Sequence, residues 1–234
     1  MKKFLFILFL AILPVFAYEV FTPNDYEYRS ESDKLLFVVD FSNSMSEYLE
    51  HQTKVNQVKE MMAHILPQIS NDTKVGLRVY GHTCNLFALN ACRSSELVVP
   101  LGLNNSTQIA TKLHKLRPRG MTPITYSLKQ AVKNDLEGFD GTKHIILLTD
   151  GGENCDESPC DYAIELMRKR RDIKIDVIAF NVHDDDDLAQ LKCTADVTGG
   201  RFSDVETKAE LFRSMENMIV PHKKEVQAVL FNGE

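Results

Sequence analysis

Apolar runs alternate along the chain with segments whose apolar residues recur at helical spacing. A continuous apolar run of about four to eight residues between turn signals is typical of a buried strand. The strand pattern is found at residues 35–40, 74–80, 96–101, 143–149, 173–180 and 201–205. Pro100 favours a sheet edge for the third of these, because proline donates no hydrogen bond to a neighbouring strand. Strands that alternate with helices predict an α/β fold, a doubly wound and mostly parallel sheet with helices on both faces.

The helical segments lie between these strands. Helices are expected to begin near Val55, Ser106, Thr122, Asp161, Asp185 and Thr207. The first should end near Pro67, and Ser106 is expected to cap the second. Thr207 and Glu210 have the spacing of a capping box, which would start the last helix.

Two of the apolar runs end abruptly in an aspartate. Asp40 ends the first and is followed by Ser42 and Ser44, while Asp150 ends the run at 143–149. Thr122 stands at the expected start of another helix. In an open α/β sheet ligands bind outside the carboxyl ends of the strands, so both aspartates should face one crevice. Carboxylates and hydroxyls are hard ligands that suit Mg²⁺, Mn²⁺ or Ca²⁺ and do not favour zinc or copper.

Each of these residues also has a purely structural interpretation. Thr122 before Pro123 is a good helix N-cap, with proline at the first helical position. The two serines and the aspartate before Gly151 and Gly152 would suit ordinary turns. The conjunction of all five at strand ends and helix starts favours a single metal site over five separate turns.

The pattern Asp40-x-Ser42-x-Ser44, then Thr122, then Asp150 resembles the metal-ion-dependent adhesion site of von Willebrand factor type A domains. The resemblance covers about residues 35–220 and extends to a group of exported bacterial members. It rests there on segments beginning at Tyr80, Gly120, Thr149, Pro159, Leu191 and Thr198. It implies a six-stranded sheet with one antiparallel edge strand, and a partner's Asp or Glu carboxylate that completes the coordination of the ion. Mg²⁺ is the expected ion, with Ser42 and Ser44 as direct ligands, Thr122 direct or through water, and both aspartates holding charge and water.

The ends of the chain are expected to lie outside this domain. Residues 1–17 have a basic start, an apolar stretch and a small-residue cleavage site, which predicts a signal peptide; an uncleaved anchor is the alternative. Residues 18–34 are expected to form a linker, 35–220 the domain, and 221–234 a tail with an extra strand. The chain has 44% hydrophobic residues and a net charge of −6, which is normal for a soluble domain and argues against nucleic acid and anionic membranes as partners.

Export would bring the cysteines into an oxidising compartment, periplasmic or extracellular. The chain has five, so one is left over or pairs between chains. Short loops favour the pairs Cys84–Cys92 and Cys155–Cys160, with Cys160–Cys193 as the rival. Paired zinc knuckles are absent from the sequence, which argues against a zinc site.

These features predict an exported, non-enzymatic, metal-dependent module for protein binding, in adhesion or assembly. A metal-dependent hydrolase that uses the same ion to activate water is the alternative from another class. It would need a general base near the ion, and Glu153 and Asp156 are the candidates in the loop after Asp150. A third interpretation is a scaffold in which the ion only makes the loops rigid. The sequence specifies neither the partner nor the oligomeric state.

Overall fold

The computed structural model describes residues 33–83, 91–138 and 141–224. Its centre is a six-stranded sheet in the order β5-β4-β1-β6-β7-β8. The strands are β1 (Lys34–Asp40), β4 (Lys74–Tyr80), β5 (Ser95–Gly102), β6 (Lys143–Thr149), β7 (Ile173–Phe180) and β8 (Phe202–Val205). Neighbouring strands pair in parallel, except that the edge strand β5 is antiparallel to β4. This confirms both the mostly parallel sheet and the antiparallel edge, and Pro100 lies on that edge.

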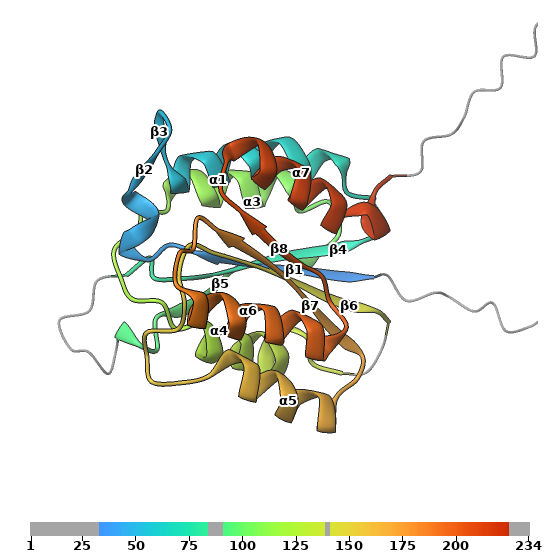
Figure 1. Ribbon diagram of the computed structural model, residues 1–234. Coiled ribbons are helices and arrows are strands. Elements are labelled where there is room, and N and C mark those ends of the chain that lie inside the picture. The colour runs from blue at the N-terminus through green and yellow to red at the C-terminus, as the bar shows by residue number, and fades with distance from the viewer. Residues whose placement is uncertain (1–32, 84–90, 139–140, 225–234) are drawn as a thin grey trace, which may run out of the picture. The chain divides into compact units, whose positions relative to one another are not determined.

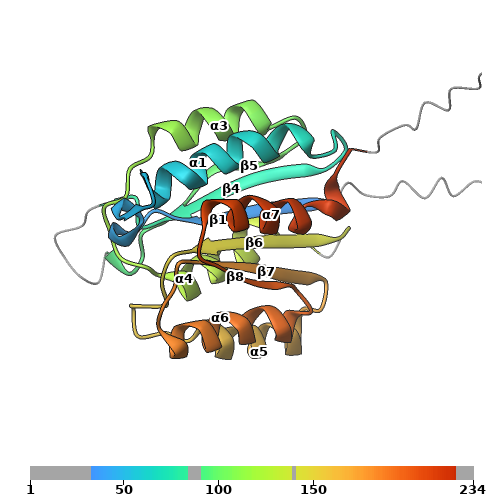
Figure 2. The ribbon, with the colours of Figure 1, turned by 45° about the horizontal axis from the view of Figure 1, so that its top comes forward.

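Helices cover both faces of the sheet, as Figures 1 and 2 show, with three described helices on each face. On one face lie α1 (Lys54–Ile65), α3 (Ser106–Lys115) and α7 (Lys208–Met218). On the other lie α4 (Ile124–Gln130), α5 (Pro159–Lys169) and α6 (Asp185–Thr198). In the described parts of the chain, no helix is both long enough and apolar enough to span a membrane.

The core consists of two apolar layers separated by the sheet. Alternate residues of β1 point to opposite faces, so that Leu35, Phe37 and Val39 join the layer under α1, α3 and α7. Leu36 and Val38 join the other layer. All five side chains are fully buried, which explains the continuous apolar run in the sequence. The run ends at Asp40, the last residue of β1, where the strand is followed by a loop.

The expected helices are present, with three corrections at their ends. Ser106 is the first residue of α3 and does not cap it; its hydroxyl donates to the carbonyl oxygen of Leu66, at 2.8 Å. The helix expected from Thr122 begins at Ile124, with Pro123 as its N-cap, and changes after Gln130 into a π-helical turn, Ala131–Asp135. The helix expected from 161 begins at Pro159, because the Ser158 hydroxyl accepts from the backbone of Asp161 and thereby caps it. The capping box of α7 is confirmed.

A small hairpin was not predicted from the sequence. β2 (Tyr48–Leu49) and β3 (Gln52–Thr53) form it directly before α1, with Glu50 at a φ of 57° in its turn. Strands of two residues are too short to give a detectable alternation of apolar and polar positions.

At the other end, the first residues of the tail pack on the domain. A 3-10 helix, Val220–His222, follows α7, and Lys223 forms a β-bridge with Ile69. The expected signal peptide, most of the expected linker and the expected extra strand lie outside the described residues.

His222 is buried within this turn. The residue is 2% exposed, and neither ring nitrogen has a hydrogen-bond partner among the residues that the structure describes. The ring packs edge to face against His144 of β6, with 4.9 Å between centroids. Burial lowers the pKa of His222 to about 4, and repulsion by positive charge on His144 and Arg201 adds to this shift. Asp33 and Asp176 act in the opposite direction.

The His222 imidazole should therefore make stability pH-dependent. A folded-state pKa below that of the unfolded chain means that its contribution is present above about pH 6.5 and is lost as the pH falls towards about 4. Between about pH 6.5 and 4, we expect the free energy of unfolding of the wild-type protein to fall by about 2 kcal/mol more than that of His222→Phe. Denaturant unfolding of both proteins at several pH values measures this difference. Parallel stability curves for the two proteins would contradict this expectation.

Candidate metal centre

Asp40 is the innermost of the five predicted ligands. It ends β1 in the middle of the sheet, is fully buried, and accepts hydrogen bonds from the Ser42 backbone N–H at 2.6 Å and the Thr149 hydroxyl at 2.8 Å. Burial and repulsion by Asp150 raise the pKa of its carboxyl to about 7, although the hydrogen bonds favour ionisation. The site therefore holds more buried negative charge than its surroundings neutralise.

Ser42, Ser44 and Asp150 form a chain of oxygens beside Asp40. The two serine Oγ atoms lie 3.0 Å apart, and the Ser44 hydroxyl donates to Asp150 Oδ1 at 2.7 Å. Ser44 belongs to the 3-10 helix Asn43–Ser46, whereas Asp150 directly follows β6. Burial also raises the pKa of Asp150. Thus two loops that are distant in the sequence place their side-chain oxygens at one end of neighbouring strands.

Lys54 supplies a cation that was not predicted from the sequence. It is the first residue of α1, only 4% exposed, and its Nζ lies 3.1 Å from Asp150 Oδ2 and 3.0 Å from Glu47 Oε2. Burial lowers the pKa of the ammonium, but Asp150 and Glu47 more than offset this, so the net shift is upward. In the sequence, a lysine at a helix start is expected to be exposed to solvent. Only the fold places Lys54 against Asp150.

Thr122 lies on a loop that runs beside the serine loop. Ser42 forms a β-bridge with Gly120, and the backbone N–H of Asn43 donates to the Gly120 carbonyl at 3.0 Å. A Cβ on Gly81 would lie 2.5 Å from the Ser42 nitrogen and 2.8 Å from the Met121 oxygen, so only glycine permits this approach. The two loops therefore meet because Gly81 lies between them.

Thr122 does not cap the helix that follows it. The N-cap position belongs to Pro123, and Thr122 itself is buried. The Thr122 backbone N–H donates to Asn154 Oδ1 at 2.7 Å, and Glu153 Oε2 accepts from the Thr125 backbone at 2.7 Å. The loop after Asp150 thus fixes the loop of Thr122. Asn154 is a positioning residue that sequence reasoning did not identify, and Glu153, considered there only as a general base, has the same positioning role.

The donor set fits a hard divalent ion. It consists of three hydroxyls and two carboxylates, all of oxygen, which Mg²⁺ and Ca²⁺ prefer. Within the described ranges, no cluster of three or more Asp, Glu, His or Cys residues is placed to hold an ion. Zinc and copper are more often bound by nitrogen and sulfur ligands, and zinc also accepts carboxylate oxygens. Metal ligation by the five residues remains a prediction.

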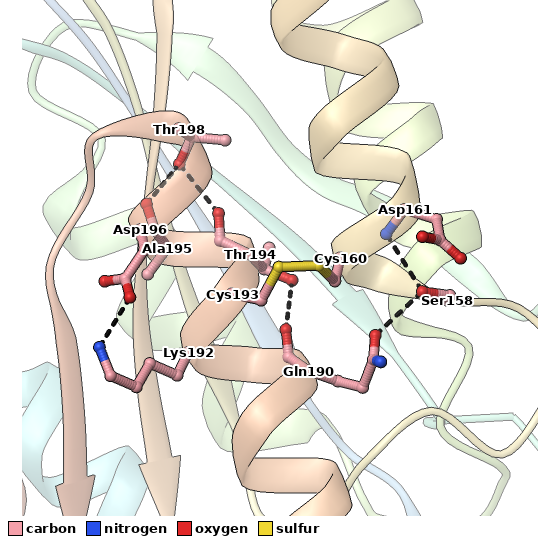
Figure 3. Close-up of a disulfide and its surroundings, with 10 residues drawn as sticks. All are labelled: Ser158, Cys160, Asp161, Gln190, Lys192, Cys193, Thr194, Ala195, Asp196 and Thr198. Carbon is pink, nitrogen blue, oxygen red and sulfur yellow. Dashed lines mark hydrogen bonds and ion pairs between the residues drawn. A yellow bond between two sulfur atoms is a disulfide. The ribbon is translucent and has the colours of Figure 1, made fainter.

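The disulfides differ from the favoured pairs. Cys92 bonds to Cys155, and Cys160 bonds to Cys193, with Cα–Cα distances of 5.5 and 5.4 Å. The pairs Cys84–Cys92 and Cys155–Cys160 are therefore wrong, while the rival Cys160–Cys193 is confirmed; Cys84 lies outside the described residues. Figure 3 shows that Cys160 lies near the start of α5 and bonds across to α6. Cys160 is the second residue of α5, and its bond to Cys193 joins α5 to α6.

The Cys92–Cys155 bond lies next to the residue that fixes Thr122. We expect Cys92→Ala/Cys155→Ala to lower the free energy of unfolding by about 3 kcal/mol and to weaken Mg²⁺ binding by about tenfold. The matched control is Cys160→Ala/Cys193→Ala, which should lose similar stability without weakening ion binding. Denaturant unfolding and calorimetric titration measure the two effects, and equal ion affinities in the two variants would contradict the expectation.

Comparisons with known proteins agree with this architecture. The family model of the von Willebrand factor type A domain matches residues 34–217. The uncharacterized protein YwmD of Bacillus subtilis (strain 168) is 25% identical over 221 residues, which are 92% of this chain and 96% of that protein.

Two solved structures share the fold at low identity. Proximal thread matrix protein 1 from the mussel byssus, with a zinc-occupied metal-ion-dependent adhesion site, has a TM-score of 0.61 and 20% identity; the match covers 81% of this chain and 45% of that one. The pilus adhesin SpaC from Lactobacillus rhamnosus GG has a TM-score of 0.62 and 16% identity, with 81% and 30% covered. The match spans less than half of each of these two structures.

Proposed function

Since the chain belongs to the von Willebrand factor type A domain family, we propose that it is an exported protein-binding module that uses a divalent ion to recognise an acidic residue of its partner. The observation that supports this most strongly is the convergence of Asp40, Ser42, Ser44 and Asp150 at one end of β1 and β6. Mg²⁺ is the ion we propose, with Mn²⁺ or Ca²⁺ as substitutes.

The side chains would have different roles in binding the ion, according to their position. Ser42 and Ser44 present neutral oxygens to the ion, and Thr122 adds a third from the neighbouring loop. Asp40 and Asp150 supply the negative charge, and the hydrogen bonds to Asp40 from Ser42 and Thr149 hold its carboxylate in one orientation. When bound, the ion supplies a Lewis-acidic position for a carboxylate of the partner. Because Lys54 already pairs with Asp150, the two carboxylates would not fully neutralise the ion, which would attract that carboxylate.

We further propose that the module is not an enzyme. A hydrolase would need a general base beside the ion. Both carboxylate oxygens of Glu153 accept backbone hydrogen bonds, from Thr125 at 2.7 Å and Cys155 at 3.0 Å, which suits a structural role. Asp156 is exposed at a φ of 57° in the same loop. The two disulfides support export, because such bonds persist in oxidising compartments.

The proposal is tested by capture of a partner from the native cell envelope. Wild-type protein and Asp40→Asn would be immobilised, and each incubated in Mg²⁺ and in chelator. We expect one partner to be retained by the wild-type protein in Mg²⁺ alone and to elute intact on chelation. Retention that is equal in chelator, or equal on Asp40→Asn, would contradict metal-dependent binding; cleavage of the retained partner would favour the hydrolase.

A further inference from the structure

A basic cavity lies beside the candidate metal centre. It has a volume of about 370 Å³ and lies between the start of α1 and the end of α3. Its lining includes Lys59, His114 and Arg117, and none of its lining residues is acidic. The whole chain carries a net charge of −6, so a cavity with only basic charged groups departs from the general character of the protein.

Lys59 and Arg117 donate to backbone carbonyl oxygens in this cavity. Lys59 Nζ donates to the carbonyl oxygen of Leu116 at 2.8 Å, and Arg117 donates to the carbonyl oxygens of His114 and Leu116. Among the described residues, neither forms a salt bridge. Burial, followed by the charge of Arg117, lowers the pKa of Lys59 to about 8. Two cations are thus held close together, with no anion from the described segments between them.

Two segments of chain bring the cavity close to the metal centre. Ser46 lines the cavity and lies in the same 3-10 helix as Ser44, two residues away, so their Cα atoms are at most about 7 Å apart. Arg117 begins the segment that leads to Thr122, and the Arg119 backbone donates to the carbonyl of Phe41 at 3.1 Å. An extended peptide with one carboxylate at the ion would therefore have its neighbouring residues within reach of the cavity.

We propose that this cavity, built around Lys59 and Arg117, is a second anion subsite that receives a further Asp or Glu of the same acidic partner segment. The proposal rests on the proposed function, since the metal centre would bind the first carboxylate. It specifies the partner more closely: its recognition segment should carry two or more acidic residues within a few positions of each other. Charge complementarity then adds orientation and specificity to the single contact at the ion.

The test uses a fluorescent oligoglutamate peptide as the probe and measures its binding by anisotropy in saturating Mg²⁺. Lys59→Met/Arg117→Gln removes both charges and keeps much of the aliphatic stems. The matched control is Lys112→Gln/Lys115→Gln, which removes two exposed charges of α3 that do not line the cavity. We expect the cavity variant to bind about tenfold more weakly and the control to bind within about twofold of the wild-type protein.

The outcomes separate this proposal from the one on which it rests. Equal affinities of the cavity variant and the wild-type protein in Mg²⁺ would overturn the cavity and leave the metal centre standing. An equal loss in cavity variant and control would also overturn it, because the effect would then come from net charge. Binding that is as strong in chelator as in Mg²⁺, and that falls only in the cavity variant, would support the cavity and overturn the metal dependence. Failure of the wild-type protein to bind the peptide at all would overturn the cavity, while calorimetry with Mg²⁺ alone would still test the metal centre.

Discussion

Asp40→Asn is expected to weaken Mg²⁺ binding by at least about 100-fold while leaving the metal-free protein folded. The asparagine oxygen can still accept from the Ser42 backbone, and the Thr149 hydroxyl can still donate to the carbonyl oxygen of Gly151, at 2.8 Å. The substitution also removes the repulsion that, together with burial, raises the pKa of Asp40 to about 7. Metal-free Asp40→Asn should therefore be at least as stable as the metal-free wild-type protein.

Isothermal titration with Mg²⁺ and thermal unfolding in chelator measure the two parts of this prediction. The control is Asp72→Asn, which removes one exposed carboxylate just before β4. Asp72 lies at the amino end of its strand, whereas Asp40 and Asp150 lie at the carboxyl ends of theirs. Its affinity for Mg²⁺ should equal that of the wild-type protein. An unchanged titration of Asp40→Asn would show that the ion, if bound, is bound elsewhere.

Lys54→Met should make the fold depend on the ion. The lysine is the cation nearest to Asp150, and removal of one partner from a buried ion pair costs about 4 kcal/mol because the other charge is left uncompensated. We expect this loss in chelator. In Mg²⁺ the loss should be much smaller, because a bound cation would compensate Asp150 in place of the ammonium, and any ligand that binds the native state stabilises it.

Chemical unfolding of wild-type protein and Lys54→Met, each in chelator and in Mg²⁺, gives the four free energies that this prediction needs. Lys208→Met is the matched control, since Lys208 also begins a helix but pairs with Glu60 at the surface, at 2.8 Å. Surface pairs of this kind contribute about 0 to 1 kcal/mol, so this control should change little in either condition. A loss in Lys54→Met that is equal with and without Mg²⁺ would argue against an ion at Asp150.

The strands were predictable because buried strands appear in the sequence as short continuous apolar runs. The expected bounds of β4, β6 and β7 agree with the structure, and β1 differs only by the inclusion of Lys34. The carboxyl ends of parallel strands meet at one edge of a sheet, so Asp40 and Asp150 could be placed together without any coordinates. The antiparallel direction of β5 was expected only from the family resemblance.

The disulfides and the positioning residues were not predictable in the same way. Short sequence separation favoured Cys155–Cys160, but the pairing depends on where α5 begins and on the proximity of two loops separated by 63 residues. Lys54 and Asn154 are polar residues whose surroundings come from other segments of the chain. Their partners, Asp150 and the Thr122 backbone, are 96 and 32 residues away, and local sequence holds no signal of such contacts.

Anomalous diffraction from crystals of the wild-type protein soaked in Mn²⁺ tests the central claim most directly, because it locates the ion among its ligands. We predict a strong peak between Ser42, Ser44 and Asp150, with both serine oxygens about 2.0 to 2.6 Å from it, the range for oxygen ligands of Mg²⁺ and Ca²⁺. The same peak should be absent from crystals of Asp40→Asn. Density at any other place in the domain, with none between these side chains, would contradict the claim.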